Sequence, residues 1–121
     1  MCSRAAKHWC GVAHLSATGP RGDGLLYRYL HAESPDGLDG QEGAFLLCSF
    51  WLVDNLTGQG RLEEAHDLYD RLCARANQVG LLAEEVDPTT GAFLGNFPQA
   101  FSHVGVISSG WALARAEHGR R

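Results

Sequence analysis

The chain has 121 residues, of which 45% are hydrophobic and 20% are charged, and this composition excludes a wholly disordered protein. Its formal net charge of −4 gives no reason to expect nucleic acid or an anionic membrane surface as a partner. No apolar run reaches the roughly 18 residues that a membrane-spanning helix needs, and no secretory signal peptide is visible. We expect one globular domain at most, with no nucleic acid and no membrane as partners.

Cysteine and histidine usage argues against a metal site. The cysteines form no C-x-x-C pair, and no histidine cluster completes a zinc pattern. We therefore predict free thiols, no metal ion, no cofactor and a reducing, cytoplasmic location. The four cysteines are Cys2, Cys10, Cys48 and Cys73.

The two ends of the chain differ from its middle. Residues 1–23 have no clear hydrophobic period, so we expect a poorly ordered leader there. Residues 24–30 suit a short strand or an extended segment, and the Pro, Gly and Asp content of residues 31–41 predicts a loop. Residues 119–121 are expected to be a solvated tail, which leaves 24–118 as the folded region.

Two helices are predicted in the middle of the chain. Residues 43–57 are apolar nearly all round, and a helix without a polar face must be buried on all sides. The chain has too little other material to bury it, which indicates that partner helices are missing. Residues 61–78 are amphipathic, with Asp67 and Arg71 spaced for an i,i+4 ion pair. We expect an antiparallel hairpin with one inner and one outer helix.

A turn and a last helix complete the chain. Residues 81–86 and 92–94 flank a predicted turn at 87–91, which contains Pro and Gly. The last helix is predicted to begin with Asn96 as its N-cap and to end near Glu117. Its expected apolar stripe consists of Phe101, Val104, Ile107 and Trp111. Its small residues, which predict close packing against another helix or a substrate pocket, are Gly105, Ser108, Ser109 and Gly110.

Two adjacent glutamates, Glu84 and Glu85, stand between apolar residues just before the turn. In extended backbone their side chains point to opposite faces, so only one of them can enter a pocket. Apolar residues accompany each of them, and the pattern by itself does not choose between them. An arbitrary pair of glutamates is most often a solvated loop.

Several stretches in sequence order resemble bacterial glycoside hydrolases of family 15, the glucoamylase and trehalase group. They are Gly24-Leu-Leu-Tyr-Arg-Tyr, then Glu42-Gly-Ala-Phe-Leu-Leu-Cys-Ser-Phe-Trp-Leu-Val-Asp, then Gly60-Arg-Leu-Glu-Glu-Ala, then the segment from Gly80 to Ile107. The resemblance covers about residues 24–118 and is similar to the C-terminal part of the family domain. It implies an all-α fold, a partial (α/α)6 barrel whose short β-turn loop carries the active-site glutamate. Residues 43–57 and 96–117 would be inner helices, and 61–78 an outer one.

The resemblance also implies a chemistry for the glutamates. Ala83-Glu84-Glu85 is similar to the Ser-Glu-Gln or Pro-Glu-Gln triplet of the family, which assigns Glu84 as the general base of an inverting glycosidase. Glu85 replaces the glutamine of those relatives and is a candidate substrate ligand. The substrate would be an α-glucoside, either trehalose or a maltose-type glucan. Glycoside hydrolysis needs a second carboxyl group as the acid, and this chain has no counterpart of it. We therefore expect the isolated chain to be inactive and the missing N-terminal half of the barrel to be its partner.

Three further residues are candidate substrate ligands. Gln99 and His103 lie one turn apart at the start of the last helix, where polar groups can bind glucose hydroxyls; the alternatives are capping for Gln99 and a structural role for His103. Trp51 can stack on a sugar face, although an aromatic residue in an apolar helix more often belongs to the core.

Two other interpretations compete with a glycosidase segment. Residues 60–69 resemble one half of a tetratricopeptide repeat, which would make the chain a helical interaction module. Such arrays need several copies at a period of about 34 residues, and only one is present. The chain is alternatively a truncated product without a function, because an apolar helix without its neighbours exposes a patch prone to aggregation.

Overall fold

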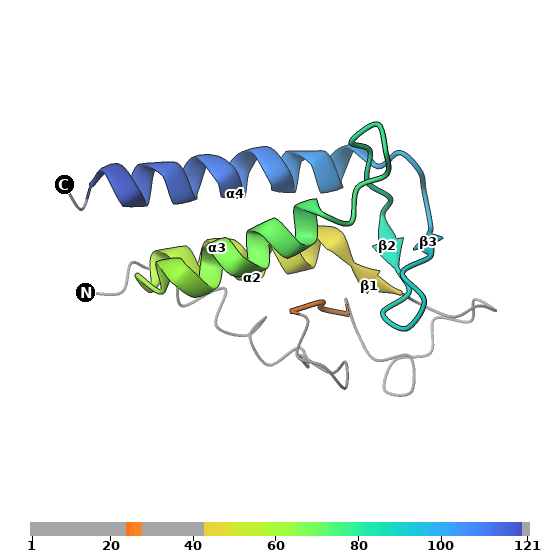
Figure 1. Ribbon diagram of the computed structural model, residues 1–121, viewed down its shortest axis with the longest axis horizontal. Coiled ribbons are helices and arrows are strands. Elements are labelled where there is room, and N and C mark those ends of the chain that lie inside the picture. Colours follow the sequence, from red (N-terminus) through yellow and green to blue (C-terminus); the bar gives the residue numbers. More distant parts are fainter. Residues whose placement is uncertain (1–23, 28–42, 120–121) are drawn as a thin grey trace.

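The computed structural model describes residues 24–27 and 43–119. Within them, three helices lie side by side, and a small sheet stands at one end of the helices (Figure 1). The elements are β1 (Ala44–Phe45), α2 (Leu46–Gly58), α3 (Leu62–Cys73), β2 (Glu85–Val86), β3 (Phe93–Leu94) and α4 (Ala100–His118). This confirms the predicted helical architecture with a short β-turn loop. The leader predicted at 1–23 and the loop predicted at 31–41 lie outside the described residues.

The sheet corrects the predicted start of the first helix. β1, β2 and β3 pair antiparallel in that order, and Leu26 makes a further bridge with Phe45, whose N–H donates to the Leu26 carbonyl at 2.8 Å. Residues 44 and 45 are therefore extended, and α2 begins at Leu46 instead of Gly43. Pairing with a strand 40 residues further along the chain overrides the local helical pattern, which sequence periodicity does not reveal.

The second predicted helix ends earlier than expected. α3 stops at Cys73 instead of Gln78, because the side chain of Asn77 supports a turn: its Oδ1 accepts the N–H groups of Val79 at 3.1 Å and of Leu81 at 2.9 Å. Asparagine commonly competes with helix in this way by bonding nearby backbone. The predicted ion pair is present, with Asp67 Oδ2 and Arg71 Nη2 2.9 Å apart.

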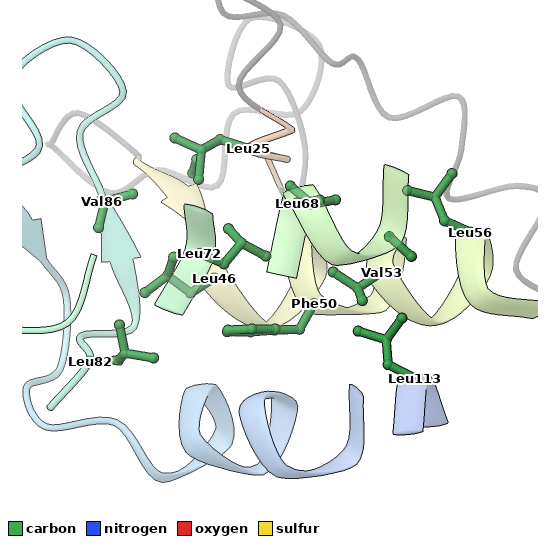
Figure 2. Packing of buried hydrophobic residues seen from close by; sticks show 12 residues of the cluster. Leu25, Leu46, Phe50, Val53, Leu56, Leu68, Leu72, Leu82, Val86 and Leu113 are labelled. Carbon is green, nitrogen blue, oxygen red and sulfur yellow. The ribbon is translucent and has the colours of Figure 1, made fainter. Parts of the chain in front are cut away.

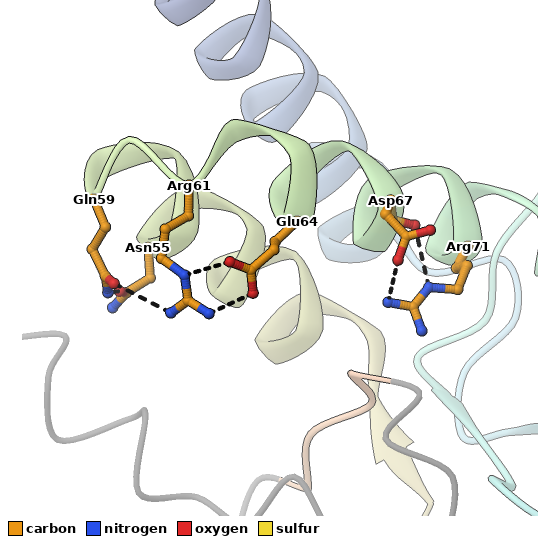
Figure 3. A network of polar contacts seen from close by, with 6 residues as sticks. All are labelled: Asn55, Gln59, Arg61, Glu64, Asp67 and Arg71. Atoms are coloured by element: carbon orange, nitrogen blue, oxygen red, sulfur yellow. Dashed lines mark hydrogen bonds and ion pairs between the residues drawn. The ribbon is translucent and has the colours of Figure 1, made fainter.

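The polar side of α3 carries solvated pairs. Arg61 and Glu64 form an ion pair, and Arg71 bonds both the carboxylate and the carbonyl of Asp67 (Figure 3). These side chains are about half exposed or more, so solvent screening leaves each pair with little effect on stability. Their role is to keep this side of α3 in water, as expected for an outer helix.

A core of aliphatic residues gathers around Phe50, which lies between α4 and the α2–α3 pair (Figure 2). The Phe50 ring meets the ring of Tyr69 edge to face, with centroids 6.1 Å apart. The Tyr69 hydroxyl then donates to the Val106 carbonyl of α4 at 3.0 Å. Phe50, from the middle of the apolar helix, thus links all three helices. The fully buried large side chains are Phe50, Leu46, Leu72, Leu82, Leu113, Val53 and Val86.

Small residues bring α4 close to α2 and α3, which confirms the predicted close helix packing for Gly105, Ser109 and Gly110, whereas Ser108 is exposed. A Cβ atom on Gly105 would lie 2.9 Å from the Phe50 ring, and one on Gly110 would lie 2.6 Å from the Tyr69 hydroxyl. The Ser109 hydroxyl donates to the Phe50 carbonyl at 3.1 Å. The buried side of α4 therefore consists of Ser102, Gly105, Ser109 and Leu113.

The predicted apolar stripe of α4 points away from this core. Its four side chains have large exposed fractions, Phe101 at 65%, Val104 at 55%, Ile107 at 72% and Trp111 at 67%. In Figure 1, α4 forms one edge of the molecule, and no other described element lies beyond it. α2 is likewise covered on one side only, since Leu47, Trp51 and Leu52 are partly exposed. Neither helix is enclosed by the part of the chain that the structure describes.

Two smaller predictions concern thiols and membranes. Cys48 is a buried free thiol and Cys73 a half-buried one, whereas Cys2 and Cys10 lie outside the described residues. None of the described helices combines the length and the apolar character that crossing a bilayer requires.

Candidate active site around Glu84

The segment that leads to Glu84 is held by the first turn of α4. The N–H of Gln99 donates to the Leu82 carbonyl at 2.9 Å, and the Ser102 hydroxyl donates to the Ala83 carbonyl at 2.7 Å. Leu82 and Ala83 are themselves buried. The carbonyl of Glu84 accepts the first N–H of α2, from Leu46, at 3.1 Å. The backbone of Glu84 is therefore fixed beside the N-terminal ends of two helices.

The two glutamates have different partners. Glu84 Oε2 accepts the backbone N–H of Asn96 and one N–H of its side-chain amide, both at 3.0 Å. Glu85 Oε2 accepts the N–H of Gly43 at 2.7 Å, which ties the carboxylate to the backbone before β1. The two carboxylates therefore bond to different parts of the chain, since Gly43 precedes β1 and Asn96 follows β3.

The two glutamates differ in whether a carboxylate oxygen remains able to accept a proton. Both donors to Glu84 converge on Oε2, and within the described residues no hydrogen bond reaches Oε1. A carboxylate held through one oxygen keeps the other free to accept a proton from water. Glu85 instead contributes to the sheet, where its backbone pairs with Phe45 and Leu94.

Asn96 is the residue that sequence reasoning misplaced. It was expected to cap the last helix, but α4 begins at Ala100 with Gln99 at its N-cap position, and no side chain caps it. The signal was available in the predicted turn at 87–91. Pairing outward from that turn matches Val86 with Phe93 and Glu85 with Leu94, which brings the next residues, 84 and 95, opposite each other.

Of the other candidates, His103 and Gln99 lie beside this segment. Both ring nitrogens of His103 are engaged by backbone: Nε2 accepts the Leu82 N–H at 3.3 Å, and Nδ1 lies 2.7 Å from the Gln99 carbonyl. These two backbone contacts favour the structural role for His103. The half-exposed side chain of Gln99 makes no cap, so the capping alternative is wrong.

Trp51 lies on α2, half-buried, five residues after the helix start. One turn further, Asp54 is a residue that sequence reasoning missed. Burial between α2 and α4 raises the pKa of its carboxyl above the ordinary value, and a contact with the Ser109 hydroxyl opposes part of that shift. The apolar residues around Asp54 in the sequence were a signal for a carboxylate in low dielectric. Within the described residues no cluster of His, Cys, Asp and Glu suits a metal ion.

Comparison with known proteins identifies the sequence family. Residues 59–111 match the family described as Glycosyl hydrolases family 15. The chain is 48% identical over 95 residues to a trehalase of Mycolicibacterium smegmatis and 47% identical over 95 residues to a trehalase of Mycobacterium tuberculosis, each match covering 78% of the chain. A trehalase of Thermoplasma volcanium is 45% identical over 85 residues, or 70% of the chain.

These matches cover only part of each relative. The chain spans 14% of the length of the two mycobacterial trehalases and 13% of the Thermoplasma protein. No solved structure matches the chain. The segment with the Glu84 loop and helix α4 falls largely within the matched residues 59–111. The chain therefore carries a segment that matches glycosyl hydrolase family 15.

Proposed function

We propose that this chain supplies the general base to the active site of an inverting α-glucosidase that hydrolyses trehalose. The proposal rests on the hydrogen bonds of the Glu84 carboxylate. Its Oε2 accepts two N–H donors of Asn96. Within the described residues no hydrogen bond reaches its Oε1, which can therefore accept a proton from water. The names of the relatives, all trehalases, favour trehalose over a maltose-type glucan.

The proposed reaction needs a second carboxyl group. In an inverting glycosidase the base and the acid stand roughly 6.5–9.5 Å apart, so that a water molecule fits between the base and the anomeric carbon. Glu84 removes a proton from that water, the water oxygen attacks the anomeric carbon, and the acid protonates the leaving oxygen. We propose that the acid comes from the remaining segments of a family 15 protein, which lie beyond the matched part of its relatives.

The exposed side of α4 supports this assignment. Four large apolar side chains with exposed fractions above one half form one stripe, and such a contiguous patch marks a contact surface. We propose that further helices of a family 15 barrel cover this stripe and the partly exposed side of α2. A cytoplasmic location is part of the proposal and is supported by the free thiols of Cys48 and Cys73.

The experiment uses a hybrid enzyme. The 95-residue segment of the Mycolicibacterium smegmatis trehalase that matches this chain is replaced by the matching residues of this chain, and glucose release from trehalose and maltose is measured. We expect the hybrid to hydrolyse trehalose, and the 121-residue chain alone to hydrolyse neither sugar. Glu84→Gln is expected to lower kcat by roughly a hundredfold to ten-thousandfold, the usual contribution of general base catalysis.

A matched control is available one residue away. Glu85→Gln removes the same charge, and we expect the hybrid to keep its activity within about tenfold, because the glutamine oxygen can still accept the Gly43 N–H and the change leaves Glu84 in place. Equal activity of Glu84→Gln and the unmodified hybrid would contradict the role of Glu84. Inversion is checked by NMR, since trehalose cleaved with inversion releases one β-glucose and one α-glucose.

A further inference from the structure

We infer that Gly95 and Asn96 are positioning residues that set which oxygen of the Glu84 carboxylate faces the substrate water. This inference rests on the proposed role of Glu84 and adds to it the part of the chain that orients the base. Neither residue was a candidate on sequence grounds, and both lie in the connection between β3 and α4.

Residues 84 and 96 bond to each other reciprocally. The Glu84 N–H donates to the Asn96 carbonyl at 2.9 Å, while Asn96 returns two donors, from its backbone and from Nδ2, to Glu84 Oε2. Three bonds between two residues fix the backbone and the side-chain rotamer of Glu84 together. Donors to an ionised acceptor make the stronger kind of hydrogen bond.

Gly95 lies close to the side chain of Glu84. Its φ of 71° lies in the left-handed region, where glycine is favoured because it has no Cβ. A Cβ atom at this position would lie 2.8 Å from Glu84 Oε2 and 3.1 Å from Glu84 Cβ. The backbone of residue 95 therefore lies against the carboxylate and excludes other positions of the side chain, and glycine is the residue that permits both the conformation and the contact.

The orientation of the Glu84 carboxylate determines whether it can accept a proton from the substrate water. Proton transfer requires the accepting oxygen to stand within hydrogen-bond distance of the water, and small displacements of a reacting group cost about a hundredfold in rate. Oε2 is engaged by Asn96, and within the described part of the chain Oε1 accepts no hydrogen bond, so the rotamer decides the geometry of the base. Asn96 does not cap α4, which removes the simplest structural explanation for an asparagine at this position.

The first test measures the contact itself and needs no activity. In the 121-residue chain, the backbone and side-chain amide protons of Asn96 are followed by NMR in the unmodified protein and in Glu84→Ala. We expect both signals to shift and to exchange with water roughly tenfold faster when their acceptor is removed. Glu85→Ala is the matched control and is expected to leave the Asn96 side-chain signal in place. An Asn96 side-chain signal that ignores Glu84→Ala would overturn the inference.

The second test separates positioning from substrate binding in the hybrid enzyme. Asn96→Ala is expected to lower kcat roughly tenfold with KM within about twofold, because Nδ2 touches the base and the backbone donor remains. Asn96→Asp keeps the shape but places a like charge beside Glu84, and its kcat is expected to be lower than that of Asn96→Ala. Asn55→Ala is the control, since Asn55 lies about 14 Å along α2 from the helix end that contacts Glu84.

The outcomes distinguish the inference from the proposal beneath it. A raised KM with unchanged kcat would make Asn96 a substrate ligand and would refute positioning, as would higher activity of Asn96→Asp than of Asn96→Ala. If the hybrid is inactive, or if Glu84→Gln keeps its activity, the proposed function fails, and the NMR comparison still decides whether the contact exists.

Discussion

Replacing Ile107 by lysine tests whether the exposed stripe of α4 is a contact surface of a larger family 15 protein. The Ile107 side chain is 72% exposed in this structure. Complete burial of such a side chain is worth about 1.5–3 kcal/mol, so covering the exposed part would contribute about 1–2 kcal/mol. Lysine would lose this contribution and would also bring a charge to an apolar contact, at a cost of several kcal/mol that bending of its long side chain toward water reduces.

The prediction has two parts, because the surroundings of Ile107 differ between the two proteins. In the 121-residue chain, Ile107→Lys should change the free energy of unfolding by less than about 0.5 kcal/mol, as for other surface substitutions, and should reduce light scattering from self-association. In the hybrid enzyme, the same substitution should destabilise by about 3 kcal/mol or more. It should therefore lower, by several degrees, the temperature at which half of the trehalose-hydrolysing activity is lost.

Val79 provides the matched control. It is also a branched aliphatic residue, and it is 69% exposed, but it lies in the turn after α3, away from the stripe. Val79→Lys should leave both proteins nearly unchanged. If the hybrid tolerates Ile107→Lys as well as Val79→Lys, the stripe is not covered, and the proposed barrel contact is wrong. Loss of more than about 1 kcal/mol from the isolated chain would show that the stripe packs within the chain itself.

Two further predictions concern the α2–α4 contact of the isolated chain, both measured by urea unfolding followed by circular dichroism. Gly105→Ala should destabilise the chain by about 1–2 kcal/mol, because the new Cβ would meet the buried ring of Phe50 at 2.9 Å and overpacking outweighs the gain of about 1 kcal/mol in helix propensity. The control is Gly58→Ala, whose Cβ meets nothing within 4 Å and which should be neutral or stabilising. A larger loss of stability from Gly58→Ala than from Gly105→Ala would refute close packing. Burial raises the pKa of Asp54 above 3.8, so the folded state favours the protonated carboxyl and loses stability as pH rises through that raised pKa. Asp54→Asn should therefore stabilise the chain at pH 7 by up to about 1 kcal/mol, a value limited by the partial exposure of the residue. The gain should vanish below the ordinary pKa of 3.8. A gain that persists there would contradict the explanation.

The sequence by itself determined the helical class, the positions of the turns and the family. The spacing of hydrophobic residues located all three helices. The predicted ends differ most from the observed ones at the C-terminal end of α3 and at the N-terminal ends of α2 and α4. In each of these places a contact with another part of the chain, or a side chain bonding to the backbone, replaced the helical hydrogen bonds. The sequence pattern left the choice between Glu84 and Glu85 open, and the resemblance to family 15 chose Glu84.

Tertiary structure decided which side of α4 is buried and what holds Glu84. The spacing of hydrophobic residues indicated an apolar stripe from Phe101 to Trp111. It could not show that the small residues on the opposite side of the helix would face the core, because close helix packing depends on the shape of the partner, here the ring of Phe50. The role of Asn96 depends in the same way on strand register, which joins residues twelve positions apart. Local sequence encodes propensity, whereas the orientation of a carboxylate depends on which donors the fold brings to it.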